Sequence, residues 1–579
     1  MNKIYINNDI KEFEYPYISI KVNGKIFEYP ESVFSIAAKR EYNGISKLEL
    51  HLKNKLGIFE EVIMSELGIF TPNSAIEVWM GEWIGKETYC AFKGTIIKLS
   101  TNENDENLSI EAKHVAEEMT KIRKLRSFKE KSYIDIIKDI CSEYNIEPSI
   151  DEDSVVPPQD PPQYNVTDWD FINILAETIG LMVFTTPEGI SVRKPDFQKD
   201  AIKISNEDIK KIEINNDSRK SPKNYIVQAW NYTEQEPDGE SPESTDSAKD
   251  LKVLSMSSQE DSRMMEIYQK ALSMRNDLAF LRGKLTIVGQ APILPNDVLD
   301  IEAVKKKFGK NVIVSSVLQV ISSEEAEATE ETKKMVEMDQ WETLIEFGYD
   351  DTAYLNRFDD VVATPSMGTI PCTNGLQIAK VEGIENDPQE QGRICIRLAN
   401  SLDTMLWARL ATLDAGDGRG TFFMPEIGDE VVVGFVDDNP GQAVVLGMLH
   451  SGKAKTPFEQ SEENHIKGYV SREKIIVQFD DEKKSLLIET PGGNKVLISD
   501  EDKGISMEDQ NGNTLVLNDQ GITMESQKKI TIKASQDVVI EGSNVNIKAN
   551  AQLKAEGTKG AELSAKGTTI VKGAMVQIN

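Results

Sequence analysis

The chain has 579 residues, of which 39% are hydrophobic and 28% are charged, and its formal net charge is −31. This length predicts three or four domains, and the hydrophobic share is sufficient for folded cores. A membrane-spanning protein is excluded, because no stretch approaches the roughly 20 consecutive apolar residues that a span requires. The net charge opposes simple attraction to nucleic acid or to anionic membranes.

The cysteines and the N-terminus indicate the compartment. The cysteines at 90, 141, 372 and 395 lack metal-ligand spacing, so we expect reduced and mostly buried thiols. The first residues continue directly into a mixed polar sequence and show no apolar core of a signal peptide. We therefore expect a protein that is made in the cytoplasm and kept there, or exported without a cleaved leader.

Residues 1 to about 118 alternate apolar and polar side chains in the manner of strands, for instance at 18–22, 48–52, 76–80 and 92–99. Turn signals such as Asn23-Gly24 and Asn43-Gly44 separate these strands. The pattern predicts a barrel-like β domain.

Two helices are predicted next, at 132–140 and 167–180, with a stiff proline-rich connector at 155–162 between them. In the second helix, Thr167 is placed to cap the N-terminus, and Asp170 occupies the position from which a side chain can bond back to the capping residue. Gly180 can end the helix in a left-handed conformation. Its buried stripe is predicted to consist of Phe171, Ile172, Leu175 and Ile179.

A second β segment follows, with strands expected near 204, 212–214, 225–229, 284–288, 312–317 and 341–347 and a helix at 264–282. Two acidic runs, 234–250 and 322–332, are predicted to be surface loops. Residues 1–360 are therefore predicted to form two β-barrel halves with helical insertions.

Residues 361–455 are predicted to form a third domain. Five short apolar strands lie near 376–378, 394–398, 406–410, 431–435 and 444–446. Five such strands, joined by short loops, suit a small barrel of the OB type. Residues 456–473 are interpreted as a neck.

From 474 to 579, apolar residues come in short alternating pairs separated by Gly, Asn, Asp and Lys. The predicted strand pairs are Ile475/Val477, Leu486/Ile488, Val496/Ile498, Leu515/Leu517, Ile522/Met524, Ile530/Ile532, Val538/Ile540 and Val545/Ile547. A single chain of such strands makes a poor core, so we predict an intertwined trimeric β-helix, or prism, about a three-fold axis. The alternative is a monomeric β-helix of the kind that polysaccharide enzymes use.

The chain lacks a catalytic constellation. The histidines at 51, 114, 450 and 465 do not pair at metal-ligand spacing, and no nucleophile elbow, zinc-protease or phosphate-loop motif occurs. Residues 416–420 are glycine-rich but carry acidic neighbours, which predicts a flexible loop rather than a phosphate site. We predict no enzyme activity, no cofactor and no metal. A carbohydrate-active β-helix is disfavoured because no aromatic residue follows Phe479.

The third domain resembles a known family. The stretches are Gln391 to Leu398, Trp407-Ala408-Arg409, Phe422 to Phe435, Asp438-Asn439-Pro440 and Val444 to His450. They resemble the OB-domain signature of the VgrG family, the spike proteins of type VI secretion and related contractile injection systems. The run from Asp168 to Leu181 is similar to a helix in the hub region of that family, and the order of regions agrees over essentially the whole chain.

The resemblance implies a mainly β, multi-domain protein that acts as a homotrimeric central spike. Its expected partners are an Hcp-like tube protein below the hub, baseplate components, effectors as cargo, and a PAAR-repeat protein at the tip; nucleic acid is not expected. The tip-binding residues are predicted to be Met575, Val576, Gln577, Ile578 and Asn579.

The resemblance also bears on location and on added domains. The spike would assemble in the cytoplasm and then be injected or released. The gap between the barrel and the prism is too short for a lysozyme domain, and no fused effector is expected. A phage-tail hub or an extracellular phage-tail-like particle remains an alternative setting.

Overall fold

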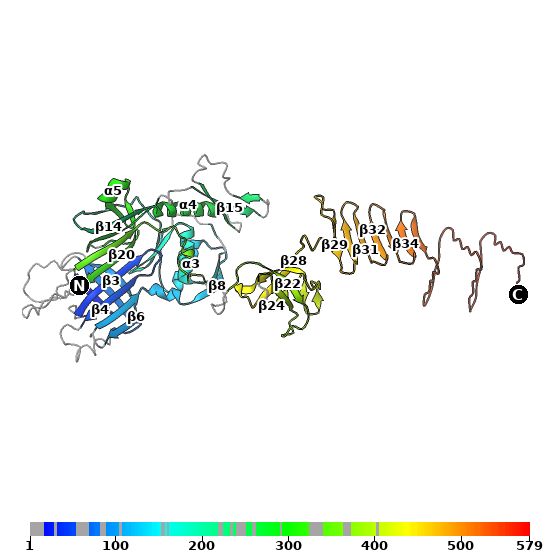
Figure 1. Ribbon diagram of the computed structural model, residues 1–579, viewed down its shortest axis with the longest axis horizontal. Helices are drawn as coiled ribbons and strands as arrows, with labels where there is room; N and C mark the ends of the chain where they lie inside the picture. Colours follow the sequence, from blue (N-terminus) through cyan, green and yellow to red (C-terminus); the bar gives the residue numbers. More distant parts are fainter. Residues whose placement is uncertain are drawn as a thin grey trace, which may run out of the picture. The chain divides into compact units, whose positions relative to one another are not determined.

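The computed structural model describes residues 17–27, 32–53, 69–81, 88–102, 107–151, 157–158, 161–217, 224–231, 236–238, 251–256, 262–289, 292–322, 340–359, 361–362, 372–400 and 405–578. The chain divides into two compact units, Met1–Cys372 and Thr373–Asn579 (Figure 1). No helix within the described ranges is both long and apolar enough to cross a membrane.

The first unit is built around one large sheet. Eleven of its thirteen strands follow the order β14-β18-β21-β20-β3-β4-β7-β6-β5-β1-β2, and β13 and β19 join at the side, where β19 also pairs with β20. The strands are β1 (Tyr17–Val22), β2 (Lys25–Ile26), β3 (Val33–Glu41), β4 (Lys47–Lys53), β5 (Ala75–Gly81), β6 (Tyr89–Asn102), β7 (Asn107–Lys113), β13 (Ile202–Ile204), β14 (Ile209–Asn216), β18 (Leu281–Val288), β19 (Val298–Ile301), β20 (Val312–Ser322) and β21 (Gln340–Phe347).

Two separate cores lie on this sheet, one for each predicted half. The first is formed mainly by strands of residues 18–112, with Leu48, Leu50 and Ile110 fully buried. The second is formed by residues 204–347 and includes Leu285 and Phe347. The halves are joined because β20 pairs antiparallel with β3 in register, so the sheet runs unbroken from one half to the other.

The helices of the first unit pack on one another and on several of its strands. They are α2 (Tyr133–Glu143), α3 (Asp168–Thr178), α4 (Ser262–Ala279) and α5 (Glu302–Phe308), with 3₁₀ turns η4 (Val115–Thr120) and η8 (Tyr354–Asn356). The predicted helix at 264–282 is correct except at its end, because the chain leaves the helix after Ala279 and enters β18 at Leu281.

The end signals of α3 are confirmed. The Thr167 hydroxyl accepts the backbone N–H of Asp170 at 3.1 Å. Gly180 has φ of +77°, and the N–H of Leu181 donates to the carbonyl of Ala176 at 2.8 Å. The predicted stripe of Phe171, Ile172, Leu175 and Ile179 is buried in the core that α2 and α3 share.

Three smaller sheets complete the first unit. They are formed by β8 (Arg123–Ser127) with β10 (Pro162–Thr167), by β9 (Ser149–Ile150) with β11 (Met182–Thr186) and β12 (Gly189–Arg193), and by β15 (Asn224–Asn231) with β16 (Glu236–Asp238) and β17 (Leu251–Met256). Of the predicted connector at 155–162, residues 155–156 and 159–160 lie outside the described residues, and Pro162 already belongs to β10. Most of the predicted loop at 234–250, and all but the first residue of the one at 322–332, lie outside the described residues.

A buried carboxylate ties β8 and β10 to the two helices. The Asp168 side chain is completely buried and accepts from Arg126 at 2.7 Å, Gln163 at 2.9 Å and Tyr144 at 2.7 Å. Lys124 lies 2.6 Å from its second oxygen. Burial raises the pKa of Asp168, but these donors and the Arg126 charge outweigh that effect and lower it below its usual value.

The second unit begins with the predicted OB barrel, which is confirmed as a closed five-stranded barrel in the order β22-β23-β24-β28-β27. Its strands are β22 (Gln377–Gly383), β23 (Ile394–Leu398), β24 (Met405–Leu410), β27 (Glu430–Phe435) and β28 (Ala443–Met448), with the 3₁₀ turn η10 (Val436–Asp438) between the last two. Inward-facing Ile394, Ile396, Val431 and Val433 form its core.

Two loops of the barrel are well defined. Gly428 has φ of +94° and precedes Asp429, whose carboxylate accepts the N–H of Glu426 at 2.9 Å, so a tight turn leads into β27. The predicted flexible loop at 416–420 is wrong. Its residues form a two-strand ladder, β25 (Ala415–Gly416) with β26 (Arg419–Gly420), and the Arg419 side chain pairs with Asp414 at 2.6 Å.

The barrel is followed by a seven-stranded antiparallel meander, in which each strand pairs with the next. The strands are β29 (Ile466–Val470), β30 (Ile476–Asp480), β31 (Ser485–Glu489), β32 (Lys495–Ser499), β33 (Gly504–Glu508), β34 (Thr514–Asn518) and β35 (Gly521–Glu525). We call this meander the C-terminal sheet. It confirms the predicted strands from 475 to 524, and it adds β29 and β33, which the sequence reasoning did not predict.

The strands predicted at Ile530/Ile532, Val538/Ile540 and Val545/Ile547 are absent. Between residues 526 and 578 the chain runs as an extended trace without a ladder (Figure 1). A strand needs a neighbour for its backbone hydrogen bonds, and no described segment of this chain lies in register beside these residues. Alternation of side chains alone therefore did not suffice to predict strands within one chain.

Candidate assembly site

The C-terminal sheet repeats with a fixed period. Strands β30, β32 and β34 begin at Ile476, Lys495 and Thr514, which are evenly spaced along the chain, and the starts of β31 and β33 keep the same spacing. The turns repeat as well. Ser471, Thr490 and Asp509 each accept a backbone N–H four positions further along, at 3.0, 3.3 and 2.9 Å. These repeated hydrogen bonds in the turns fix the register of successive strands.

The hydrogen bonds of the third turn lower the pKa of its carboxylate. Asp509 accepts the backbone N–H groups of Asn511 and Asn513, and also the Asn513 side-chain amide at 2.7 Å. These bonds lower the pKa of Asp509 to about 2, and the bonds from Asn513 have the largest effect.

One face of the sheet carries two continuous aliphatic columns. In the observed register, one column runs Val477, Ile488, Val496, Met507, Leu515, Met524. The other runs Phe479, Leu486, Ile498, Ile505, Leu517, Ile522. Together these twelve side chains form what we call the aliphatic face. Every strand from β30 to β35 contributes one residue to each column.

No described part of this chain covers the aliphatic face. Ile488, Ile498 and Met507 are 42–44% exposed, and Ile522 is 71% exposed. Among the described residues, the hydrophobic core clusters stop at the OB barrel and include none of the twelve. Full burial of one such side chain is worth about 1.5–3 kcal/mol. The face is thus a large apolar surface of the kind that marks a protein interface.

The predicted tip residues continue this exposure. Met575 is 85% exposed and Ile578 is 90% exposed, with Val576 half exposed between them. Gln577 is exposed too, and Asn579 lies outside the described residues. Met575, Val576 and Ile578 are close in sequence, and all three keep this exposure in the described chain.

Contacts with the first strand hold the C-terminal sheet to the OB barrel. The rings of Phe423 and Tyr469 meet edge to face, with centroids 5.1 Å apart. Arg472 pairs with Glu426 at 2.9 Å. Gly468 is required beside them, because a Cβ there would lie 2.3 Å from the carbonyl of Val477. Sequence reasoning missed this junction, although an aromatic residue in the predicted neck was a usable signal.

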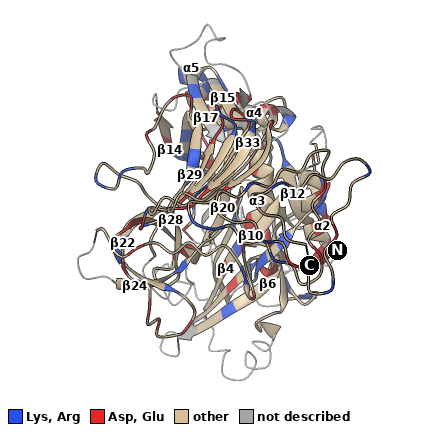
Figure 2. Cartoon of the chain, turned by 90° about the vertical axis from the view of Figure 1, so that its right-hand side faces the viewer, with Lys and Arg blue, Asp and Glu red and all other residues tan. Residues whose placement is uncertain are grey.

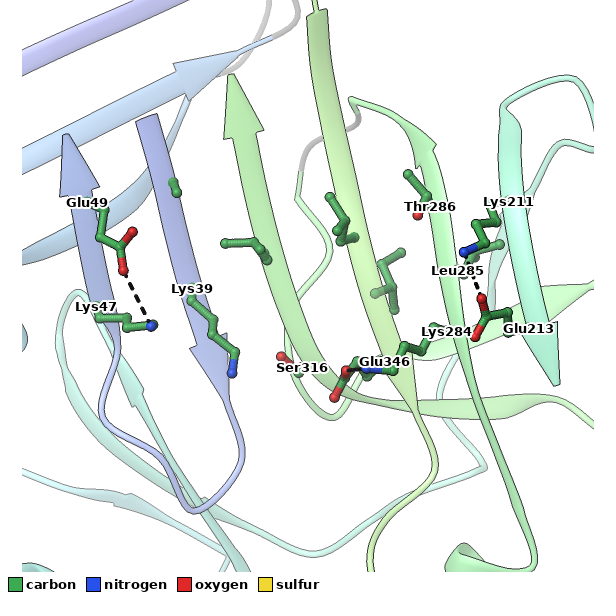
Figure 3. A pocket seen from close by; sticks show the side chains of 14 residues that line it. Lys39, Lys47, Glu49, Lys211, Glu213, Lys284, Leu285, Thr286, Ser316 and Glu346 are labelled. Atoms are coloured by element: carbon green, nitrogen blue, oxygen red, sulfur yellow. Dashed lines mark ion pairs between the residues drawn. The ribbon is translucent and has the colours of Figure 1, made fainter. Parts of the chain in front are cut away.

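The first unit carries a different feature, an open hollow of about 520 Å³ on the large sheet that is lined by both charged and aliphatic side chains (Figure 3). It crosses strands β14, β18, β21, β20, β3 and β4, and both signs of charge are spread over the strands of this unit (Figure 2). Its ion pairs include Lys211 with Glu213 at 2.7 Å and Lys284 with Glu346 at 2.5 Å.

The charges in this hollow are compensated rather than poised for catalysis. The Glu346 hydrogen bond raises the pKa of Lys284, and the Lys211 hydrogen bond lowers the pKa of Glu213. Both shifts keep the groups ionised near neutral pH, whereas a general acid or base needs a pKa close to the working pH. Lys284 and Glu213 therefore act as members of charged pairs in this hollow.

The histidines and acidic residues give no further site. His114 is buried, and its Nδ1 accepts the N–H of Ala116 at 3.2 Å as a cap of η4. Desolvation lowers its pKa to about 4, so it is neutral at physiological pH. Over the described part of the chain, no group of three His, Cys, Asp or Glu residues is placed to hold a metal ion.

Three family models match the chain in the order of its parts. Residues 14–323 match the Alg8 N-terminal domain. Residues 377–450 match the type VI secretion system/phage-baseplate injector OB domain, and residues 485–579 match the phage baseplate V C-terminal trimerisation domain. The chain belongs to the family of the Alg8 N-terminal domain, whose model matches more than half of its length, and it carries the OB and trimerisation domains of the VgrG and phage-baseplate spike proteins. The aliphatic face from Leu486 onward lies within the trimerisation domain, which supports a homotrimer.

Individual relatives are distant. The spike proteins VgrG1a and VgrG5 of the type VI secretion system of Pseudomonas aeruginosa are 24% identical over 99 residues and 32% identical over 98 residues. These matches cover 16% and 15% of this chain and 15% and 12% of the relatives. The matched segment therefore spans only a small part of the length of these curated relatives.

Several solved structures are similar to this chain. A prophage tail protein of Shewanella oneidensis has 11% identity and a TM-score of 0.43, over 58% of this chain and 99% of that one. A type VI secretion component of Escherichia coli has 13% identity and a TM-score of 0.37, over 74% and 99%. A Francisella PdpA–VgrG complex has 12% identity and a TM-score of 0.36, over 90% and 89%.

Proposed function

We propose that this chain is the membrane-puncturing central spike of a contractile injection apparatus and works as a homotrimer. The aliphatic face carries the proposal. The constant spacing of the strands keeps two columns of apolar side chains in line over six strands, and only sister chains wound around the same axis would bury all of them together. Hydrogen-bonded strands interlocked between chains would form a stiff rod, which suits a mechanical role without covalent chemistry.

The first unit would serve as the base of the spike. Its continuous sheet, formed from two halves with separate cores, would present a wide ring in a trimer and seat on an Hcp-like inner tube with baseplate components around it. The test is to mix the purified chain with an Hcp-like tube protein and to image the tubes by electron microscopy. Trimeric caps at tube ends are expected; tubes with bare ends would contradict the seating.

The end of the chain would receive a tip protein. Met575, Val576 and Ile578 are exposed and apolar, and a PAAR-repeat protein seated on them and on Gln577 and Asn579 would cover them. Effectors would travel on this cap or along the rod. Deleting residues 569–579 should abolish capture of a PAAR-repeat protein in a pull-down, while the internal control, an equal deletion within 239–250, should not. Retained capture by the first deletion would overturn the tip proposal.

The cell-bound and the extracellular versions of this machine differ in their neighbouring genes. Genes for membrane-anchoring components beside this one support a type VI secretion system, in which the spike assembles in the cytoplasm and is then injected. Genes for tail fibres and release functions without such anchors support a phage tail or a phage-tail-like particle.

A further inference from the structure

The charge of the chain reverses sign near its C-terminus. Residues 526–579 hold eight lysines and four acidic residues, a net charge of +4, so residues 1–525 carry −35. The adjoining C-terminal sheet, residues 466–525, holds seven basic and twelve acidic residues, a net charge of −5. The reversal therefore occurs within one unit, immediately after β35. We call residues 526–579 the basic segment.

The lysines of the basic segment are exposed and mostly without acidic partners. They are Lys528, Lys529, Lys533, Lys548, Lys554, Lys559, Lys566 and Lys572. All eight are exposed in the structure. Among the described residues of this segment, Lys554 alone forms an ion pair, with Glu556. After Glu562 the chain contains two lysines and no acidic residue at all.

The overall charge does not cancel this local one. In physiological salt, a charge acts over about 8 Å before counterions screen it. A surface that meets the basic segment therefore senses the lysines near it, rather than the net −31 of the whole chain. In a homotrimer the segment would contribute three times +4, which is +12, over a short length of rod.

From this reversal we propose that the basic segment binds the anionic phosphate headgroups of a lipid membrane. This rests on the proposed function, since the segment directly behind the capped tip of a spike meets the lipids of a target membrane as the spike enters it. Lysines near an anionic bilayer contribute about 1 kcal/mol each, and their long apolar stems can lie among the headgroups. Single-stranded nucleic acid fits less well, because its binding sites stack bases on aromatic side chains, and none follows Phe479.

The test uses the full-length chain and co-sedimentation with vesicles. Vesicles of phosphatidylcholine with phosphatidylglycerol should bind the wild-type protein, while pure phosphatidylcholine should not, and raising the salt should weaken binding. The variant Lys566→Gln/Lys572→Gln should bind at least about tenfold more weakly. The matched control is Lys453→Gln/Lys483→Gln, two exposed lysines of the same unit outside the basic segment, and it should bind as the wild type does.

The outcomes separate this inference from the proposed function. Light scattering of each variant reports whether the trimer is intact. Three results for an intact trimer would contradict lipid binding without affecting the proposed spike function. They are no binding to anionic vesicles, equal binding to both vesicle types, and the same loss of affinity in both variants. A trimer that prefers duplex DNA to anionic vesicles overturns the lipid inference too. A monomeric wild-type protein would instead contradict the proposed spike function, on which the lipid inference rests.

Discussion

The OB barrel and the C-terminal sheet follow each other in sequence and use the same alternation of apolar and polar residues, yet they bury them differently. In the barrel, Ile396 and Val433 point into a closed core and are fully buried. In the sheet, Ile488 and Ile498 occupy equivalent alternating positions and remain 42–44% exposed. Alternation thus specifies that a face will be buried, whereas closure decides whether the same chain buries it.

The largest expected effect comes from placing charge on the aliphatic face. The double variant Ile488→Asp/Ile498→Asp would bury six carboxylates in a trimer, and burying unpaired charge is prohibitively costly. We expect complete loss of the trimer in sedimentation velocity, with the OB barrel still folded.

The control for that variant is Lys483→Asp, which places the same charge at an exposed turn of the same sheet. It should remain trimeric. A trimer that survives the double aspartate would show that sister chains do not cover the aliphatic face, and the contrast with the barrel would disappear.

The next effect concerns a charge that the chain buries by itself. Asp168→Asn removes the carboxylate that Arg126 and Lys124 contact and leaves both cations near a buried amide. Breaking a buried pair in this way costs about 3–5 kcal/mol. The free energy of unfolding of the first unit, measured by urea denaturation, should fall by this amount at neutral pH.

The pH dependence gives this prediction its sign. The pKa of Asp168 is lowered on folding from a usual value of 3.8. Its contribution is therefore complete above about pH 4 and is lost as the pH falls through the folded pKa. The difference between wild type and Asp168→Asn should shrink below that pH. A difference that stays constant with pH would mean that the carboxylate charge is not what stabilises the cluster.

Truncating one side chain in the barrel core and one on the aliphatic face should separate burial within a chain from burial between chains. Ile396→Ala should cost about 2–5 kcal/mol, because it leaves a cavity in a core that one chain closes. The loss of melting temperature should not depend on protein concentration. Ile498→Ala should instead lower stability more at low concentration, since dilution favours dissociation of the trimer. Equal concentration dependence of the two variants would contradict the distinction.

The smallest effect tests a helix end. Gly180→Ala places a side chain at φ of +77° and brings its Cβ to 3.3 Å from that of Ala271, which should cost about 1–2 kcal/mol in thermal unfolding. Gly452→Ala is the control, with open space around it and no positive φ, and should change stability by no more than about 0.5 kcal/mol. Equal melting temperatures for the two variants would argue against the left-handed end.

Local signals in the sequence predicted much of the fold. The caps of α3 could be predicted because Thr167 and Gly180 act on backbone groups close to them in the chain. The five OB strands were readable because each alternates over a short run between turn residues. The strand β33 carried the same signal in Ile505 and Met507 and was overlooked, whereas β29 has Lys467 and Gly468 within it and offered little pattern.

Other features depended on pairings that no local pattern encodes. The union of the two halves of the large sheet depends on β20 meeting β3, although one strand begins at Val312 and the other at Val33. The compensated charges of the hollow come from five strands, so no motif marks them. The aliphatic pairs at 530–547 have the right alternation, but their ladder partners are not in the described part of the same chain.

The most direct test is the molar mass of the wild-type protein, measured by light scattering during size exclusion. We expect a trimer, with three times the 64.7 kDa of one chain, that persists on dilution. A species of 64.7 kDa with its C-terminal sheet intact by hydrogen exchange would contradict the account, because the aliphatic face would then be stable without sister chains.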